Sequence, residues 1–225
     1  MTRVGITSDR FAMVADRYEE VGLQPVHLPC VTFEPRSEAD LTRARTAAAN
    51  AGLLVATSPR IISTLWPSGG MPSVEVAAVG SATASATTRA GGAVVLIGDA
   101  GLARLAERIA DRPQVPRMVL THAEGSEPAA LTRLRQLAPD LEEHVIYEMR
   151  PTSPSLDPVE AVAFASPSAV FGWALSRSLD DVVVGAIGPT TARAVATVRS
   201  PDVVADTPSH DALARAIAAF MEVPA

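Results

Sequence analysis

Two serine–proline pairs are the first residues whose type and place in the chain suggest a ligand site. Ser58-Pro59 and Ser166-Pro167 each follow a short apolar run, where they suit the N-cap and the first residue of a helix. A helix N-terminus presents free backbone N–H groups, and open α/β sheets bind ligands beyond the carboxyl ends of their strands. Both pairs are therefore candidates for anion binding, although helix capping alone also explains them.

Two glycine–threonine turns have the same character. Gly80 and Thr83 lie in VGSATA, and Gly188, Thr190 and Thr191 lie in IGPTTA. Glycine permits a close backbone approach, and the threonines place hydroxyls in the first turn of a helix. Such turns suit a ligand with several carboxylates, whereas capping without a ligand remains an alternative. Neither turn has the G-x-G-x-x-G spacing of a dinucleotide site.

Tyr147 and Arg60 are the side chains that could act on or hold a substrate. A phenol with an unperturbed pKa near 10 is protonated at neutral pH and can serve as an acid. Arg60 follows the first serine–proline pair and could pair with a carboxylate, or could be an exposed helical residue. Packing is the alternative role for Tyr147, and Tyr18 fits the apolar stripe of a helix. The sequence offers no Ser/His/Asp or Cys/His nucleophile set.

Composition excludes several classes of chemistry. All 19 basic residues are arginine, so a P-loop lysine and a lysine Schiff base are excluded. The formal charge of −6 argues against nucleic acid as a partner. The four histidines lie far apart in the sequence, without the spacing of metal ligands. We therefore expect no metal site.

The chain of 225 residues is 48% hydrophobic and 20% charged, which predicts a globular protein of two small domains. Its apolar stretches are too short to span a bilayer, so no membrane association is expected. Arg3, Asp9 and Arg10 interrupt the region where a secretory signal would lie, and Cys30 is the single cysteine. These features predict a cytoplasmic protein without disulfides.

An internal repeat organises the chain. ATSPRII recurs as FASPSAV, VAAVGSATASA as VGAIGPTTARA, and LAERI as LARAI, all at an offset of 108 residues. VGITS also resembles MVLTH, and the segments that end in Pro35 and Pro151 correspond at an offset of 116. The repeat fits either a domain inserted into another in permuted order or two tandem halves divided near residue 117.

Short apolar runs alternate with Ala/Leu/Arg-rich helical segments along the whole chain. This alternation predicts about ten strands in parallel βαβ units. We therefore expect an α/β protein with two flavodoxin-like parallel-sheet domains and a cleft between them. In the permuted arrangement, the segments that end in Pro35 and Pro151 are the crossings between the domains.

The motifs TSPRII, VGSATA, the E-G-x-x-P-x-x-L segment, VIYEMRP, ASPSAV and AIGPTTARAVA occur in the order seen in uroporphyrinogen-III synthases. The chain resembles this family over nearly its whole length. The resemblance implies a cofactor-free lyase of tetrapyrrole biosynthesis. Such an enzyme removes the terminal hydroxyl of hydroxymethylbilane as water. It closes the ring through a spirocyclic intermediate, with inversion of the last pyrrole, to give uroporphyrinogen III.

The family resemblance also implies a domain plan and site residues. It favours the permuted plan, with domain 1 formed by residues 1–35 and 151–225, domain 2 inserted as residues 36–150, and a two-stranded linker between them. Tyr147 matches the family tyrosine proposed to assist loss of the hydroxyl. Cleft positions of the family match Ser58, Thr83, Ser166 and Thr191. His122 departs from the family, which often has arginine there, and this puts a substrate contact in doubt.

Charge is distributed unevenly between the predicted domains. Residues 36–150 hold 12 arginines and 12 acids, whereas the remainder holds 7 arginines and 13 acids. We therefore expect the inserted domain to capture most of the octacarboxylate substrate. A transient contact with hydroxymethylbilane synthase and a monomeric state are further expectations. The alternative function is a non-catalytic binding or sensor module for a small polycarboxylate.

Overall fold

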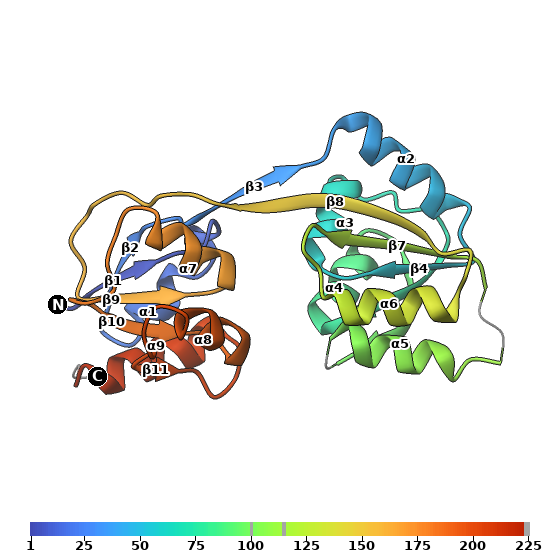
Figure 1. Cartoon of the computed structure of the whole chain (residues 1–225). Coiled ribbons are helices and arrows are strands. Elements are labelled where there is room, and N and C mark those ends of the chain that lie inside the picture. The colour runs from blue at the N-terminus through green and yellow to red at the C-terminus, as the bar shows by residue number, and fades with distance from the viewer. Residues whose placement is uncertain (100, 114–115, 223–225) are drawn as a thin grey trace. The chain divides into compact units, whose positions relative to one another are not determined.

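The computed structural model describes residues 1–99, 101–113 and 116–222. Its contacts divide the chain into two compact units, which we call unit 1 (1–33 and 149–225) and unit 2 (34–148). Each unit is an α/β structure built on its own sheet (Figure 1). No helix within the described ranges is long and apolar enough to cross a membrane.

Unit 1 combines segments from both ends of the chain. Its strands are β1 (Arg3–Ile6), β2 (Gln24–His27), β9 (Ala161–Phe164), β10 (Val183–Ala186) and β11 (Val203–Val204). Its helices are η1 (Phe11–Met13), α1 (Ala15–Glu19), α7 (Pro167–Ala174), α8 (Pro189–Val195) and α9 (His210–Phe220).

Unit 2 is formed by one continuous segment. Its strands are β4 (Leu53–Ala56), β5 (Glu75–Val79), β6 (Ala93–Gly98) and β7 (Met118–Ala123). Its helices are α2 (Glu38–Ala49), α3 (Pro59–Leu65), α4 (Gly80–Arg89), α5 (Leu102–Ala110) and α6 (Pro128–Leu137). The boundaries between the units fall inside β3 (Val31–Pro35) and β8 (Glu142–Pro151), which are neighbours in one sheet.

Strand order confirms the flavodoxin-like prediction and explains the two repeat offsets. The sheet of unit 1 has the order β11-β10-β9-β1-β2, with parallel neighbours, which is the flavodoxin order in chain sequence. The second sheet has the order β3-β8-β7-β4-β5-β6. If β7 is taken as the first strand and β8 as the second, with β4, β5 and β6 as the third to fifth, these five strands have the same order as those of unit 1. The tandem alternative divided near residue 117 is wrong, because one sheet contains strands from both chain ends.

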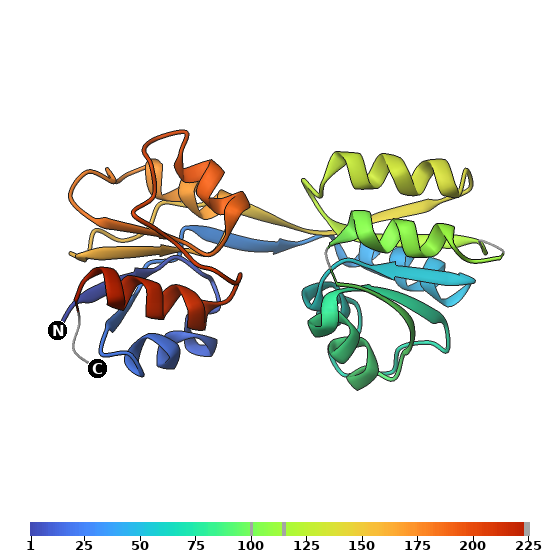
Figure 2. The same cartoon turned by 90° about the horizontal axis from the view of Figure 1, so that it is seen from below.

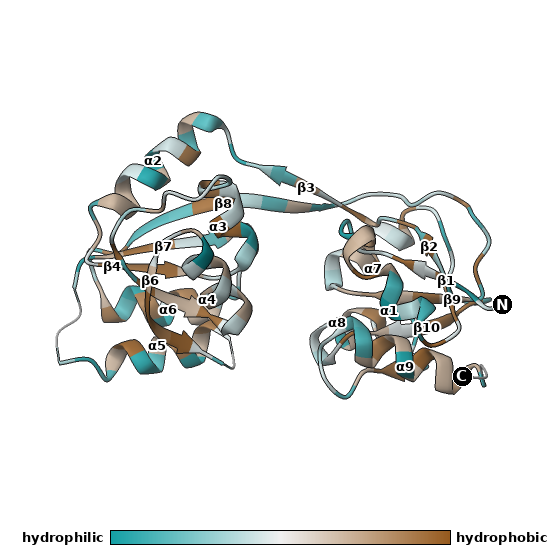
Figure 3. Ribbon diagram, turned by 180° about the vertical axis from the view of Figure 1, so that it is seen from behind, coloured by the Kyte–Doolittle hydropathy of each residue, from teal (hydrophilic) through white to brown (hydrophobic). Residues whose placement is uncertain are grey.

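Each sheet is covered by helices on both faces (Figures 1 and 2). In unit 1, Phe164 and Trp173 belong to the core beneath α7 and α8, whereas Ile6 and Tyr18 belong to the core beneath α1 and α9. In unit 2, α5 and α6 pack on one face through a shared apolar cluster, and α3 packs against α4. Brown apolar segments mark the strands inside each unit, and teal segments occur on the covering helices (Figure 3).

The structure differs from the sequence prediction in two short elements. The helical spacing of apolar residues from Ala12 to Val21 predicts one helix that ends at Gly22, but the structure divides this segment into η1 and the five-residue α1. Val14 leaves the helical region with φ −134° and ψ −13°, which interrupts the hydrogen-bonding pattern. The segment DVVADT predicts a longer last strand, but the strand is only Val203–Val204, because the residues after Ala205 bend towards the start of α9. Gly22 does end its turn with a positive φ of 78°.

Candidate active site

Ser58 lies at the carboxyl end of β4 and begins α3. Its hydroxyl oxygen accepts a hydrogen bond from the backbone N–H of Ile61 at 3.4 Å, and Pro59 occupies the first helical position. The predicted cap is therefore confirmed. The Ser58 hydroxyl also lies 3.2 Å from the phenol oxygen of Tyr147, 89 residues away in the sequence. The capping serine is thus within hydrogen-bonding distance of a phenol O–H group.

The local irregularity of β8 sets the position of Tyr147. His122 of β7 pairs with Val145, but the next residue, Ala123, pairs with Tyr147, so Ile146 is an extra residue in the ladder. Such a bulge redirects the side chains that follow it. The backbone N–H of Glu124 donates to the Tyr147 carbonyl oxygen at 2.9 Å. The tyrosine side chain is 7% exposed, so most of its ring is packed while its hydroxyl meets Ser58.

Arg60 lies beside the same tyrosine. The central carbon of its guanidinium is 5.8 Å from the centroid of the Tyr147 ring, within the range of a cation–π contact. Ser58, Arg60 and Tyr147 therefore form one cluster, which we call the tyrosine cluster. It places a fixed cation and a hydroxyl beside a phenol, an arrangement suited to holding an anionic group near a proton donor.

The predicted Gly80 turn lies at the end of β5, the strand next to β4. Gly80 has φ +77°, and a Cβ built on it would meet nothing within 4 Å, so the backbone there is accessible to an approaching group. Thr83 in the first turn of α4 is 1% exposed, and its hydroxyl oxygen finds no hydrogen-bond partner within the described residues. A buried hydroxyl of this kind is costly unless another group completes it.

The corresponding turns of unit 1 are built in the same way. Ser166 caps α7 by accepting from the Ala169 N–H at 3.3 Å, and Pro167 is the first helical residue. Gly188 is the N-cap of α8, and Thr191 is 3% exposed in its first turn. The exposed Thr190 accepts a hydrogen bond from Arg193 at 3.3 Å. The structure therefore groups the predicted residues into two sets, one in each unit.

Three residues discussed in the sequence have structural roles. Tyr18 is fully buried, as predicted, and its hydroxyl lies 3.0 Å from Nδ1 of His210. Burial raises the pKa of the Cys30 thiol to about 12, so this cysteine is a poor nucleophile. His122 is 6% exposed, and its Nδ1 lies 3.0 Å from the Ala123 carbonyl oxygen.

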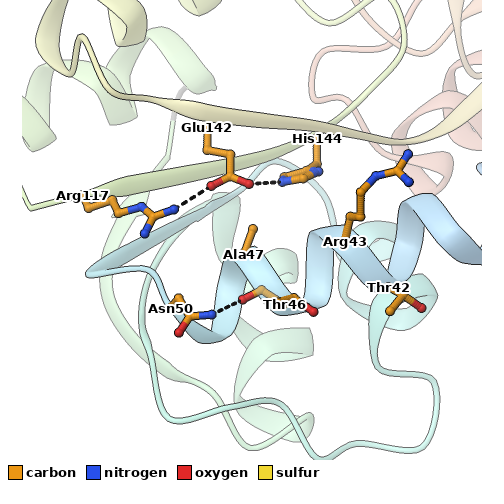
Figure 4. A pocket seen from close by; sticks show the side chains of 8 residues that line it. All are labelled: Thr42, Arg43, Thr46, Ala47, Asn50, Arg117, Glu142 and His144. Carbon is orange, nitrogen blue, oxygen red and sulfur yellow. Dashed lines mark hydrogen bonds and ion pairs between the residues drawn. The ribbon is translucent and has the colours of Figure 1, made fainter.

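A polar pocket of about 540 Å³ lies at the other end of the unit 2 sheet and was not anticipated from the sequence (Figure 4). Arg117 precedes β7 and Glu142 begins β8, so the pocket is at the amino ends of these strands. Hydrogen bonds from His144 at 3.0 Å and Arg117 at 2.9 Å hold the pKa of Glu142 below its usual value. None of the predicted site residues lines this pocket. In the described part of the chain, no group of three His, Cys, Asp or Glu residues could hold a metal ion.

Comparison with known proteins agrees with the resemblance of the motifs. A family model described as uroporphyrinogen-III synthase HemD matches residues 13–215. A mutant uroporphyrinogen III synthase from the extremely thermophilic bacterium Thermus thermophilus has a similar fold, with 19% identity, a TM-score of 0.68 and full coverage of both chains. Uroporphyrinogen-III synthetase from Helicobacter pylori has 17% identity and a TM-score of 0.71, covering 98% of this chain and 100% of its own. No curated protein matches the sequence at a significant level.

Proposed function

Because the chain belongs to the uroporphyrinogen-III synthase family, we propose that it dehydrates and cyclises hydroxymethylbilane with inversion of the last pyrrole ring. In this proposal the protein is a carbon–oxygen lyase. The observation that carries the catalytic assignment is the tyrosine cluster, in which a largely buried phenol meets a serine hydroxyl at 3.2 Å.

Tyr147 is the proposed general acid. Its O–H gives a proton to the terminal hydroxyl of the substrate as the C–O bond breaks, so the hydroxyl leaves as water. The methylene carbon left by the departing hydroxyl is attacked by the α carbon of the last pyrrole that carries the bridge, which forms the spirocyclic intermediate implied by the family. The old bridge C–C bond then breaks, and the freed bridge carbon bonds to the other α carbon of the same pyrrole. That carbon loses one proton, which restores the phenol. The electron-rich pyrrole expels its hydroxyl with little assistance, so the enzyme chiefly holds the geometry and needs no cofactor.

Ser58 orients the acid in this scheme. Its oxygen already accepts the Ile61 N–H, so the serine rotor is constrained before it meets the tyrosine hydroxyl. A fixed partner reduces the number of orientations available to the phenol. Arg60 supplies a positive charge beside the ring, which suits a carboxylate of the substrate.

Backbone N–H groups at the helix N-termini are the proposed sites for the other carboxylates. Most of this binding uses the main chain, so single side-chain deletions in it should have small effects. The proposed binding residues are Ser58, Pro59, Arg60, Gly80, Thr83, Ser166, Pro167, Gly188, Thr190 and Thr191.

Further parts of the proposal concern the protein as a whole. We take unit 1 and unit 2 as the two domains expected from the repeat. We propose a cytoplasmic monomer that receives its substrate from hydroxymethylbilane synthase, in a transient contact or by free diffusion. The linear bilane is unstable and can close spontaneously to the uninverted isomer. A short path between the two enzymes would therefore limit loss of the substrate.

Isomer analysis tests the function directly. Freshly made hydroxymethylbilane is incubated with the protein, and the oxidised products are separated by chromatography beside a reaction without protein. We expect predominantly type III uroporphyrin. Formation of type I at the spontaneous rate, by protein shown to be folded, would reject the synthase and favour the polycarboxylate-binding module.

A further inference from the structure

Arg36 connects the backbone and side chains on both sides of Tyr147. It follows β3, and its backbone N–H donates to the carbonyl oxygen of Ile146 at 2.9 Å. Ile146 is the extra residue of the β8 bulge, directly before the tyrosine. The Arg36 main chain therefore holds the irregular residue that sets where the Tyr147 side chain points.

The Arg36 guanidinium reaches two carboxylates that flank the tyrosine. It donates a hydrogen bond to Glu124 and lies 3.8 Å from Glu148, the residue after Tyr147. The Glu124 backbone N–H in turn donates to the Tyr147 carbonyl oxygen at 2.9 Å. One arginine thus fixes the bulge before the tyrosine, the residue after it, and the loop bonded to its carbonyl.

The partial shielding of Arg36 from water supports a role in ordering the segment around Tyr147. The Arg36 side chain is 34% exposed and that of Glu148 is 27% exposed, so both are partly withdrawn from water, whereas the Glu124 side chain is 53% exposed. A single exposed ion pair contributes little to stability, at most about 1 kcal/mol. A cation that contacts two acids can nevertheless restrict the backbone near both of them. When one ion pair is formed, the arginine is already held in place for the second.

We propose that the Arg36 side chain positions Tyr147 by acting through Glu124 and Glu148. The backbone hydrogen bond of Arg36 to Ile146 holds the β8 bulge and remains in every side-chain variant. The inference deepens the proposed function and depends on it for the kinetic effect. Misplacement of a catalytic group by about 1 Å can cost up to about 100-fold in rate. Loss of one of several supports should cost less, about tenfold in kcat, with little change in KM.

Kinetics of Arg36→Gln test this role, with Arg104→Gln as a matched control. Arg104 pairs with Glu107 on the surface of α5 and is 61% exposed. We expect Arg36→Gln to lower kcat about tenfold with KM within twofold, and Arg104→Gln to change neither. Arg36→Lys, which can still pair with one acid, should be intermediate. A raised KM with unchanged kcat would overturn positioning and indicate that Arg36 binds substrate itself.

A double-variant cycle tests the route through Glu124. If Glu124 acts by being held by Arg36, Glu124→Gln should lower kcat in the native background and have little further effect in Arg36→Gln. Fully additive losses would contradict this route. Thermal unfolding of each variant shows whether it remains folded at the assay temperature.

A spectroscopic measurement separates this inference from the proposed function. Labelling tyrosine at the ring Cζ gives two NMR resonances, because the chain contains only Tyr18 and Tyr147. Tyr18→Phe assigns them. We expect Arg36→Gln to shift or broaden the Tyr147 resonance and to leave that of Tyr18 unchanged; an unaltered Tyr147 resonance would reject the inference. If the native protein made no type III product, the proposed function would fail, while this resonance would still show whether Arg36 fixes the tyrosine.

Discussion

The two units share a framework but differ where chemistry is possible. Ser58 and Ser166 cap corresponding helices, 108 residues apart, with similar distances to the N–H groups they accept. In unit 1, the Ser166 hydroxyl lies 3.0 Å from that of Ser168. In unit 2, the residue equivalent to Ser168 is Arg60, and the serine meets Tyr147 instead. The serine–proline turn is therefore built alike in the two units, but the residues that contact its serine differ.

The position equivalent to Tyr147 makes the difference sharper. At the offset of 116 residues it corresponds to Val31, which is 4% exposed and belongs to the unit 1 core. Unit 1 therefore has a capping serine with neither a phenol nor an arginine at the equivalent positions. Capping turns suit both units for binding anions, but of the two equivalent serine–proline turns it is the one in unit 2 that has a phenol in contact with its serine. We infer that unit 2 carries the acid step and unit 1 contributes binding alone.

Tyr147→Phe should have the largest effect, because it removes the phenol O–H and leaves the ring. Loss of a general acid costs roughly 100- to 10,000-fold, and we expect a fall in kcat near the lower limit, about 100-fold, because the pyrrole expels its hydroxyl with little assistance. Tyr18→Phe is the matched control, since it removes the other tyrosine hydroxyl of the chain. Steady-state rates and isomer ratios measure both variants. Full kcat with the inverted product in Tyr147→Phe would end its role as the acid.

Gly172→Ala should be the most damaging change to stability. A Cβ at Gly172 would lie 1.9 Å from the Cys30 carbonyl oxygen and 2.7 Å from that of Thr152, which are backbone atoms beside the two connecting segments. The equivalent residue in unit 2 is Thr64 of α3, whose hydroxyl donates a hydrogen bond to the Arg60 carbonyl oxygen at 2.7 Å. We expect Gly172→Ala to lower the free energy of unfolding by about 3 kcal/mol and Thr64→Ala by less than about 1 kcal/mol.

Denaturant unfolding at constant pH measures the Gly172 and Thr64 variants. Equal losses for the two would show that the close approach of α7 to the connecting segments is absent in solution. That result would also remove one of the clearest differences between the units.

The parts of this architecture that depend on local chemistry were predictable from the sequence. Ser58-Pro59 and Ser166-Pro167 specify helix starts through their own hydrogen bonding and fixed φ, and both begin helices as expected. The repeat offsets predicted which strands and helices correspond. The approach of Tyr147 to Ser58 was not predictable, because it depends on a one-residue bulge and on contacts across 89 residues. Arg36 could be noticed only as the residue after a predicted crossing.

Charge reversal at Arg60 should have an intermediate effect and tests the expectation that unit 2 captures the substrate. An arginine of unit 1 serves as the comparison, and the acidic balance of that unit predicts a smaller effect there. Arg177 is unsuitable, because its guanidinium donates to the carbonyl oxygens of Ser155 and Asp157 and lies 4.4 Å from the Trp173 ring centroid. The exposed Arg215 on α9 is a better control. We expect Arg60→Glu to raise KM about tenfold, the loss of one carboxylate contact.

The KM of Arg215→Glu should stay within twofold of the native value at the same ionic strength. Equal increases in the two variants would mean that general charge, and not the place of Arg60 beside Tyr147, determines capture. A salt titration adds a second criterion, because a direct contact partly withdrawn from water is screened less than a distant surface charge.

The smallest expected effect is a pH dependence of stability confined to unit 1. His210 begins α9, and desolvation by burial lowers its pKa below 6.5, so the folded state favours neutral imidazole. Nδ1 of this imidazole lies 3.0 Å from the Tyr18 hydroxyl oxygen, so this hydrogen bond also depends on the protonation of the ring. The contribution of His210 to the free energy of unfolding is therefore greatest above pH 6.5. It declines as pH falls below 6.5 towards the lowered pKa, with a slope of at most about 1.4 kcal/mol per pH unit.

His210→Leu isolates this contribution, because Leu102 stands at the equivalent position of unit 2. Urea unfolding at several pH values between 5 and 8 is compared for the native protein and the variant, so the other three histidines cancel. We expect the difference in stability between the two proteins to change with pH below 6.5 and to be constant above 7. If the difference is constant over the whole range, His210 titrates alike in the folded and unfolded chains, and the units do not differ in their response to acid.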